Sequence, residues 1–229
     1  MNDPGMTLSL TDIEVRYGEL VAVQPLTLRQ SPGTILAVTG PSGAGKTSLL
    51  WAMCRAAQPA YGEVRVGEQR LDDHDQALDA GVVLIPQGNG LARILTATEN
   101  IVVPLAARPP HDPDTDEDPD PLAAAEQALA AVGMTESGTH LVEELSGGQQ
   151  QRVAVARGIA QKGAVLLADE PTSELDATNR DKVLALLRRE ADRGAVVVLA
   201  TNDVEAAEVC DAHARLHEGE LDWVRPFGM

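Results

Sequence analysis

Aromatic side chains are scarce in this sequence and make up only 2% of its 229 residues. With so few rings, the interior must be built mainly from valine, leucine, isoleucine and alanine, a composition typical of parallel sheets in α/β proteins. Hydrophobic residues account for 44% and charged residues for 23% of the chain, which is ordinary for a globular protein. The length suffices for one domain, or one domain with an insert, to bury a sizeable core.

Long apolar runs are also missing, and none approaches the roughly 20 residues that a membrane-spanning helix needs. The first residues, MNDPGMTLSL, contain no basic region followed by an apolar stretch, so we expect no secretory signal. The two cysteines, Cys54 and Cys210, form no C-x-x-C pair and are expected to be reduced structural thiols. Together these absences predict a cytoplasmic chain.

Positive charge is in short supply as well. The chain has 18 lysine and arginine residues against 35 aspartate and glutamate residues, a formal net charge of −17 at pH 7. Such a surface repels the phosphate backbone of nucleic acids and bare anionic lipid. We therefore expect no nucleic-acid partner, and any phosphate-bearing ligand must bind at a local site that the fold builds for it.

Apolar segments alternate along the chain with segments of helical character. The first part is rich in short strands with period-two alternation, at 7–18 and 21–28 and in a hairpin at 61–67. Further strands are expected at 34–39, 81–87, 164–170 and 195–201, helices at 46–57, 122–133, 146–163 and 179–193, and a final hairpin at 214–223. Within the third helix, Ser146 is the expected N-cap and Gly163 the expected stop. This order predicts a mainly parallel α/β sheet.

Residues 108–121, RPPHDPDTDEDPDP, combine five prolines with six acidic side chains. That composition is typical of a solvated, mobile loop, because it offers no apolar face to bury. An acidic arm that binds a partner is the alternative.

A glycine-rich turn with the sequence GPSGAGKT joins the strand at 34–39 to the helix that starts at residue 46. It matches the P-loop pattern G-x-x-x-x-G-K-[ST] in the strand-to-helix context that the pattern requires. Backbone N–H groups of such a loop, with the N-terminus of the helix, bind phosphate oxygens. Lys46 can reach the β- and γ-phosphates, and Thr47 can offer its hydroxyl to Mg²⁺. The candidate nucleotide-binding residues here are Gly40, Pro41, Ser42, Gly43, Ala44, Gly45, Lys46, Thr47 and Ser48.

Two carboxylates, Asp169 and Glu170, end the strand VLLADE. At this strand end Asp169 would lie beside the P-loop and help to hold the metal shell, while Glu170 can act as a general base on an attacking water. A carboxylate at a strand end is common by itself. Paired with the P-loop, however, these two residues indicate Mg²⁺-dependent nucleotide hydrolysis.

The stretch LSGGQQQR at 145–152 has the features of a second anion site. Ser146 is placed to cap a helix whose first turn contains glycines, which permit a close approach to phosphate. A capped helix without a ligand is the alternative. Together with GPSGAGKT and VLLADE, however, this stretch resembles the signature of the ATP-binding cassette (ABC) ATPases. The resemblance covers essentially the whole chain and implies one nucleotide-binding domain over 1–229, with an α/β P-loop core, an N-terminal antiparallel β subdomain and a helical subdomain near 88–158.

The resemblance also implies that two cassettes enclose two ATP molecules, each between the P-loop of one chain and the signature of the other. Tyr17 matches the aromatic residue that stacks on adenine, although a core tyrosine would look the same. Gln87 matches the glutamine that touches Mg²⁺ or the attacking water and senses the membrane partner. In SELD at 173–176, Asp176 matches a residue that crosses toward the second chain, and Glu174 replaces a frequent alanine or asparagine. The signature residues that would contact the partner's ATP are Ser146, Gly147, Gly148 and Gln149.

TATENIVVPLAAR, residues 96–108, resembles the subgroup that serves lipoprotein-release, macrolide-export and cell-division transporters. The resemblance implies ATP and Mg²⁺ as ligands, a second cassette in a homodimer, and a separate transmembrane permease that holds the chain at the inner face of the cell membrane. It favours the export or extraction of envelope lipids or peptides. A regulatory cassette that signals without transport, and a soluble ABC protein acting in translation or repair, are the alternatives.

Asn202 stands where most ABC ATPases have a histidine that contacts the γ-phosphate. An amide can donate a hydrogen bond there, but it does not reach as far and does not become a cation. Asn202 could also serve as an N-cap or turn residue, with the next helix beginning at Asp203. Three consequences stay open: a slow but active ATPase, a degenerate site paired with an active cassette, and a deliberate substitution that traps bound ATP. The five histidines, none of which replaces it by position, are His74, His111, His140, His213 and His217.

Overall fold

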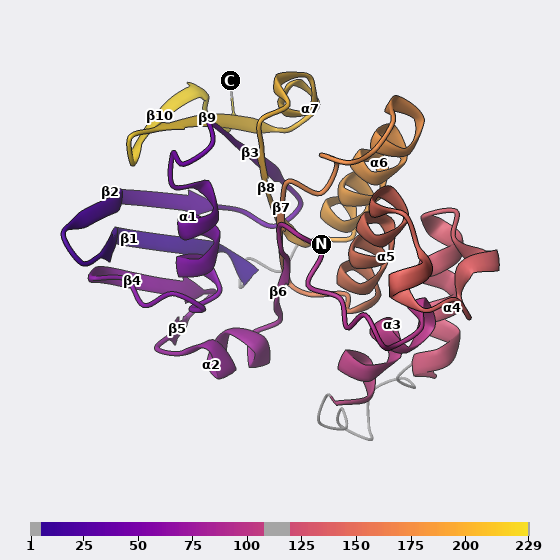
Figure 1. Ribbon diagram of the computed structural model, residues 1–229. Helices are drawn as coiled ribbons and strands as arrows, with labels where there is room; N and C mark the ends of the chain where they lie inside the picture. Colours follow the sequence, from indigo (N-terminus) through magenta and orange to yellow (C-terminus); the bar gives the residue numbers. More distant parts are fainter. Residues whose placement is uncertain (1–5, 108–119, 229) are drawn as a thin grey trace.

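The computed structural model describes residues 6–107 and 120–228. Its centre is a six-stranded sheet in the order β10-β9-β3-β8-β7-β6 (Figure 1). The strands are β3 (Ile35–Thr39), β6 (Val82–Ile85), β7 (Val165–Asp169), β8 (Val196–Thr201), β9 (Ala212–His217) and β10 (Glu220–Arg225). Only β10 pairs in the antiparallel direction, with β9. The predictions of a mainly parallel sheet and of a final hairpin are therefore confirmed.

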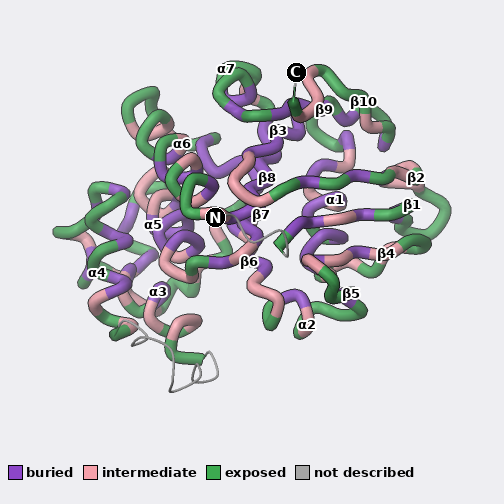
Figure 2. The backbone as a smooth tube through the Cα atoms, turned by 180° about the vertical axis from the view of Figure 1, so that it is seen from behind, coloured by how far each residue is buried: buried purple, intermediate pink, exposed green. Residues whose placement is uncertain are grey.

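Both faces of the central strands β3, β6, β7 and β8 are buried, because successive side chains of each of these strands enter two different hydrophobic cores. In β3, for example, Leu36 and Val38 belong to one core, and Ile35 and Ala37 belong to the other. In Figure 2 the central strands are coloured mostly as buried, and the outer elements are more exposed. Burial on both faces explains why the strands read as continuous apolar runs rather than alternating ones.

An antiparallel sheet in the order β2-β1-β4-β5 covers one face. Its strands are β1 (Leu8–Tyr17), β2 (Leu20–Gln30), β4 (Tyr61–Val66) and β5 (Gln69–Leu71). Helix α1 (Lys46–Met53) lies between this sheet and the parallel one, and its Leu49 and Leu50 are fully buried there. The short helix α2 (His74–Asp79) leads from β5 into β6. The predicted N-terminal antiparallel unit is thereby confirmed.

Helices cover the opposite face of the parallel sheet and extend beyond it (Figure 1). They are α3 (Ala97–Ala106), α4 (Pro121–Ala131), α5 (Gly147–Ala160), α6 (Ala177–Asp192) and α7 (Val204–Glu208), with 3-10 turns η2 (Thr135–Ser137) and η3 (Val142–Glu144). Their apolar residues share one core with the sheet. The bounds of a helical subdomain near 88–158 stay a prediction. Among the residues that the structure describes, no helix is long and apolar enough to cross a membrane.

Two helix ends differ from the prediction by three residues or more. The helix expected over 46–57 ends at Met53, and the one expected to stop at Gly163 ends at Ala160. In each case a basic residue soon after the helix turns the chain with a positive φ, 57° at Arg55 and 48° at Lys162. Gly163 serves another purpose: a Cβ there would lie 2.6 Å from the carbonyl oxygen of Gly81.

The acidic, proline-rich loop predicted at 108–121 lies almost entirely outside the described residues. Its last two positions are described, and both start α4: Asp120 caps the helix by accepting from the Leu122 amide, and Pro121 occupies the first turn.

Candidate functional site

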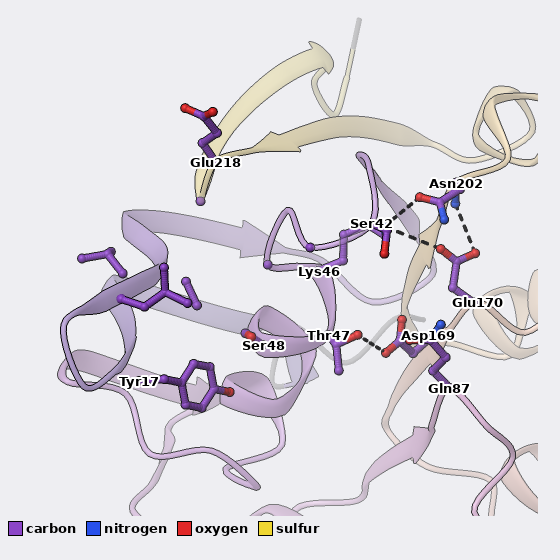
Figure 3. Close-up of a pocket in the computed structure, with 16 residues that line it drawn as sticks. Tyr17, Ser42, Lys46, Thr47, Ser48, Gln87, Asp169, Glu170, Asn202 and Glu218 are labelled. Carbon is purple, nitrogen blue, oxygen red and sulfur yellow. Dashed lines mark hydrogen bonds and ion pairs between the residues drawn. The ribbon is translucent and has the colours of Figure 1, made fainter.

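Four chain segments meet at the carboxyl edge of the parallel sheet, where they follow β3, β6, β7 and β8. Ligands of open α/β sheets bind at this edge. Here the segments and the hairpins β1–β2 and β9–β10 surround a cavity of about 500 Å³ (Figure 3). The structure thus brings together residues predicted from distant parts of the sequence: Tyr17, Ser42, Gly43, Gly45, Lys46, Thr47, Ser48, Gln87, Asp169, Glu170 and Asn202.

The P-loop, residues 40–47, packs so closely against neighbouring backbone that two of its positions have no room for a side chain. A Cβ on Gly40 would overlap the carbonyl oxygen of Leu216, and one on Gly45 would overlap that of Ala22. Gly43, with φ 81°, faces open space instead. The pattern therefore encodes close backbone packing as well as the access to phosphate that the sequence suggested.

Lys46 is 93% buried, with a relative exposure of 7%. Its Nζ donates to the carbonyl oxygen of Gly40 at 2.8 Å and to Oδ1 of Asn202 at 2.8 Å. It also lies 3.6 Å from Oε1 of Glu170. Because an ammonium group has only donors, the oxygen of the Asn202 amide must face it. The cation therefore stands at the junction of the segments that follow β3, β7 and β8 (Figure 3).

Asp169 and Thr47 form a second junction, since Thr47 Oγ1 donates to Asp169 Oδ2 at 2.6 Å. The other carboxylate oxygen, Oδ1, is buried and has no hydrogen-bond partner among the described residues. Burial raises the pKa of Asp169 and nearby Glu170 adds to the rise, whereas the Thr47 hydroxyl and the charge of Lys46 oppose it. A buried carboxylate oxygen without a partner is costly, so this atom is suited to receive a cation.

Glu170 has a left-handed backbone, with φ 49°. For a residue with a Cβ this conformation carries strain of about 1–3 kcal/mol and persists only where the surroundings hold it. The Glu170 amide donates to the carbonyl oxygen of Ala200 at 2.8 Å, and its Oε2 accepts from the Asn202 amide at 3.2 Å. These contacts turn the carboxylate toward the cavity, beside Lys46 (Figure 3).

Asn202 does not cap the helix that follows it, so the prediction of an N-cap was wrong, whereas its alternative, a turn residue, agrees with the bend of the chain at this position. Asp203 is the N-cap of α7, and its Oδ1 accepts from the amides of Glu205 and Ala206. The helix begins at Val204 rather than at Asp203. The side chain of Asn202 is therefore not used as a helix cap and points toward Lys46.

The predicted signature residues do not line this cavity. Ser146 caps α5 as expected: its Oγ accepts from the Gln149 amide, and Gln149 Oε1 accepts from the Ser146 amide at 2.9 Å. Asp176 likewise caps α6, and the hydrogen bond from the Asn179 amide lowers its pKa. Within one chain, both positions act as helix caps.

Three features of the site were not found from the sequence. Glu218 and Gly219 line the cavity, because the turn of the last hairpin lies against β2, with the Gln24 amide donating to Gly219. Gln151 is buried behind Glu170. Glu174 places its carboxylate where a Cβ on Gly147 would stand. No local motif marks these contacts, since each joins residues far apart in sequence.

Comparisons with known proteins agree with this arrangement. The sequence profile of a family described as "ABC transporter" matches residues 23–173. The lipoprotein-releasing system ATP-binding protein LolD of Maricaulis maris is 38% identical over 225 residues, which cover 93% of this chain and 95% of that protein. The putative 2-aminoethylphosphonate import ATP-binding protein PhnT of Salmonella typhi is 35% identical over 215 residues, 93% of this chain but only 56% of that protein.

Among solved structures, the dimeric post-hydrolysis state of the ATP-binding cassette MJ0796, bound to ADP and Pi, superposes with a TM-score of 0.83. The two sequences are 28% identical, and the match covers 96% of this chain and all of that one. The fold and site therefore define an ATP-binding cassette. This chain belongs to the ABC transporter family. The resemblance predicted from the sequence is confirmed.

Proposed function

We propose that this chain binds Mg-ATP in the cavity beside the P-loop, closes as a homodimer on ATP, and hydrolyses it to drive a separate membrane subunit. The observation that carries this proposal is the separation of its two anion-binding elements. The P-loop lines the cavity and the signature residues do not. A second chain, applied to the open side, would bring its signature to the nucleotide.

ATP would lie along the cavity from Tyr17 to the P-loop. Tyr17 is 46% exposed at the end of β1 and lines the cavity, so its ring is accessible to an adenine base. The triphosphate would take the backbone N–H groups around Gly43 and the N-terminus of α1. Lys46 would move its hydrogen bonds from the loop carbonyl and Asn202 to phosphate oxygens.

Mg²⁺ fits the junction of Thr47 and Asp169. Magnesium prefers oxygen ligands and is held by few protein groups beside substrate phosphates. That donor set is supplied by Thr47 Oγ1 on α1, by Asp169 Oδ1, which has no partner among the described residues, and by the exposed side-chain amide of Gln87 after β6. When bound, the ion would neutralise charge on the β- and γ-phosphates.

Glu170 would take the proton of the attacking water while the water oxygen bonds to the γ-phosphorus. The bond to the β–γ bridging oxygen breaks, leaving ADP and phosphate. The backbone amide of Asn202 donates to the Glu170 carboxylate, and the side-chain oxygen of Asn202 accepts from Lys46. Of the three consequences considered for Asn202, these contacts favour a slow but active enzyme, because the base and the cradle are both complete.

The membrane subunit would dock in the hollow between β6, α2 and α3. This hollow has a volume of about 450 Å³, and Leu78 and Val103 on its lining are 52% and 53% exposed. The segment that follows Gln87 forms its wall, where Arg157 donates to the carbonyl oxygens of Asn89 and Gly90. An apolar helix of the partner seated there would therefore reach Gln87 through this segment.

The similarity to LolD supports extraction or export of envelope lipids or peptides by a complex at the inner face of the cell membrane. The similarity to PhnT leaves import as the competing direction. A regulatory cassette would share every residue of the site. Movement of cargo by the assembled complex separates regulation from transport.

The test of the proposed function is Mg-ATP turnover by the purified chain beside E170Q. We expect turnover to fall by roughly 10²–10⁴ in E170Q, the usual contribution of a general base. Light scattering with ATP should show E170Q accumulating as a dimer, since it binds but does not cleave. A parent whose turnover equals that of E170Q would refute hydrolysis at this site, and an ATP-saturated monomer would refute closure.

A further inference from the structure

Gln151 is a buried polar residue of α5 that no step of the proposed mechanism uses. Its exposure is 5%, and all the hydrogen bonds of its side chain go to residues 170–174. Nε2 donates to the carbonyl oxygen of Glu170 at 2.9 Å and to Oγ of Ser173 at 3.0 Å. Oε1 accepts from the Glu174 amide at 2.8 Å. A glutamine is required because this set needs two donors and one acceptor on a single group.

Gln151 binds the backbone of Glu170, the residue with the strained left-handed conformation. The Glu170 backbone has φ 49°, and its carbonyl oxygen also accepts from Ser173 Oγ at 3.1 Å. On the other side, the Glu170 amide is tied to Ala200 of β8. The orientation of the Glu170 peptide, and with it the direction of the carboxylate, is therefore set between the sheet and α5.

We propose that Gln151 is a positioning residue that couples the signature helix of one chain to the general base of the same chain. This inference rests on the proposed function. Ser146 caps α5, and Gln151 lies about one turn into the same helix. The signature would contact ATP held by the partner, whereas Glu170 acts on ATP held by its own P-loop. Occupancy of one site would thus orient the base of the other.

The consequence is positive cooperativity in ATP hydrolysis. A shift of α5 on contact with the partner's nucleotide passes to residues 170–174 through three hydrogen bonds and not through the P-loop. Loss of these bonds should lower kcat and the Hill coefficient while leaving nucleotide binding in place.

The test compares Q151M and Q151E with Q150M. Methionine keeps the length of glutamine without its hydrogen bonds, and glutamate keeps an acceptor while removing both donors. Gln150 is a matched control, because its Nε2 donates to the carbonyl oxygens of Val142 and Leu145 and not to residues 170–174. The readouts are kcat, KM, the Hill coefficient, affinity for a fluorescent ATP analogue, and ATP-dependent dimerisation.

For Q151M and Q151E we expect kcat to fall roughly tenfold to a hundredfold, the scale of a small misplacement of a catalytic group, with a Hill coefficient near one. Analogue affinity and the ATP-dependent dimer should persist. Q150M should change KM and dimerisation rather than kcat at saturating ATP. Unchanged kcat and cooperativity in Q151M would overturn the inference, and so would a parallel loss of binding, dimerisation and kcat, which indicates scaffolding alone. Failure of the proposed function itself would appear earlier, as parent turnover insensitive to E170Q.

Discussion

The nucleotide cradle, which is the P-loop with Asp169 and Asn202, can be compared with the N-terminal end of α5, which carries the signature. Both are candidate anion sites at a helix N-terminus, but they differ in how far their residues already contact one another across the site. In the cradle, Lys46 is paired with Asn202, and Thr47 with Asp169, across three strands. At the signature, among the residues that the structure describes, the side chains of Ser146 and Gln149 bond only to each other's backbone amides. Under the proposed function, the cradle binds the nucleotide within one chain, and the signature contributes to binding only when a second chain is present. Binding would then need one chain and hydrolysis two.

Of the substitutions K46M, N202H and E174Q, K46M should have the largest effect, because it breaks the cradle. This change removes the buried cation and leaves the Glu170 carboxylate without its ion pair. We expect turnover to fall by about 10²–10³, the cost of losing one preorganised electrostatic group, together with loss of ATP affinity. Steady-state kinetics and binding of a fluorescent analogue check both. K182M, at an exposed lysine of α6, is the control, and equal losses in the two variants would contradict the assignment.

A smaller effect in the opposite direction should follow N202H. A histidine here would offer a longer donor toward the γ-phosphate while the backbone amide still holds Glu170. We expect turnover to rise about tenfold to a hundredfold, somewhat less than the usual value of one positioned donor. N202A removes the whole side-chain carboxamide, including the oxygen that faces Lys46, and its turnover should not rise. If the rates of N202H and the parent agree, the substitution is not what limits this site.

The smallest effect is expected at the signature. Glu174 places its carboxylate against Gly147, where the partner's phosphates would lie. In E174Q, removal of this repulsion should tighten ATP-driven dimerisation by roughly threefold to tenfold, less so at high salt because exposed charges are screened. Sedimentation in an E170Q background measures it, with E126Q on α4 as the control. If E174Q tightens dimerisation no more than E126Q does, Glu174 does not lie at the dimer interface.

Much of the cradle and of the signature could be predicted from sequence, because the patterns that mark them are local. Apolar runs bounded by turns gave the parallel strands, and GPSGAGKT in its strand-to-helix context gave the cradle. The capping role of Ser146 followed from the residue type and the helix after it. Each of these depends on neighbours within a few positions.

The rest depends on contacts between distant residues and was not predictable. The left-handed backbone of Glu170 is stabilised by Gln151 and Ala200, 19 residues before it and 30 after it. Glu218 reaches the cavity only because the last hairpin folds back on β2. The helix stop assigned to Gly163 was wrong for a similar reason: that glycine makes room for the backbone at Gly81.

The central claim, that each working site takes its cradle from one chain and its signature from the other, is tested most directly by mixing two inactive variants. K46M retains a signature, and S146R retains a cradle and Glu170. Mixed in equal amounts with ATP, they should recover turnover that neither variant has alone, and about a quarter of parental turnover is the upper bound, because half of the dimers are mixed and each has one complete site. Coupling through Gln151 places the recovered turnover below that bound, since the second site of a mixed dimer is empty. K46M mixed with E170Q, two lesions on the cradle side, should recover nothing. Recovery in both mixtures, or in neither while mixed dimers form, would contradict the account.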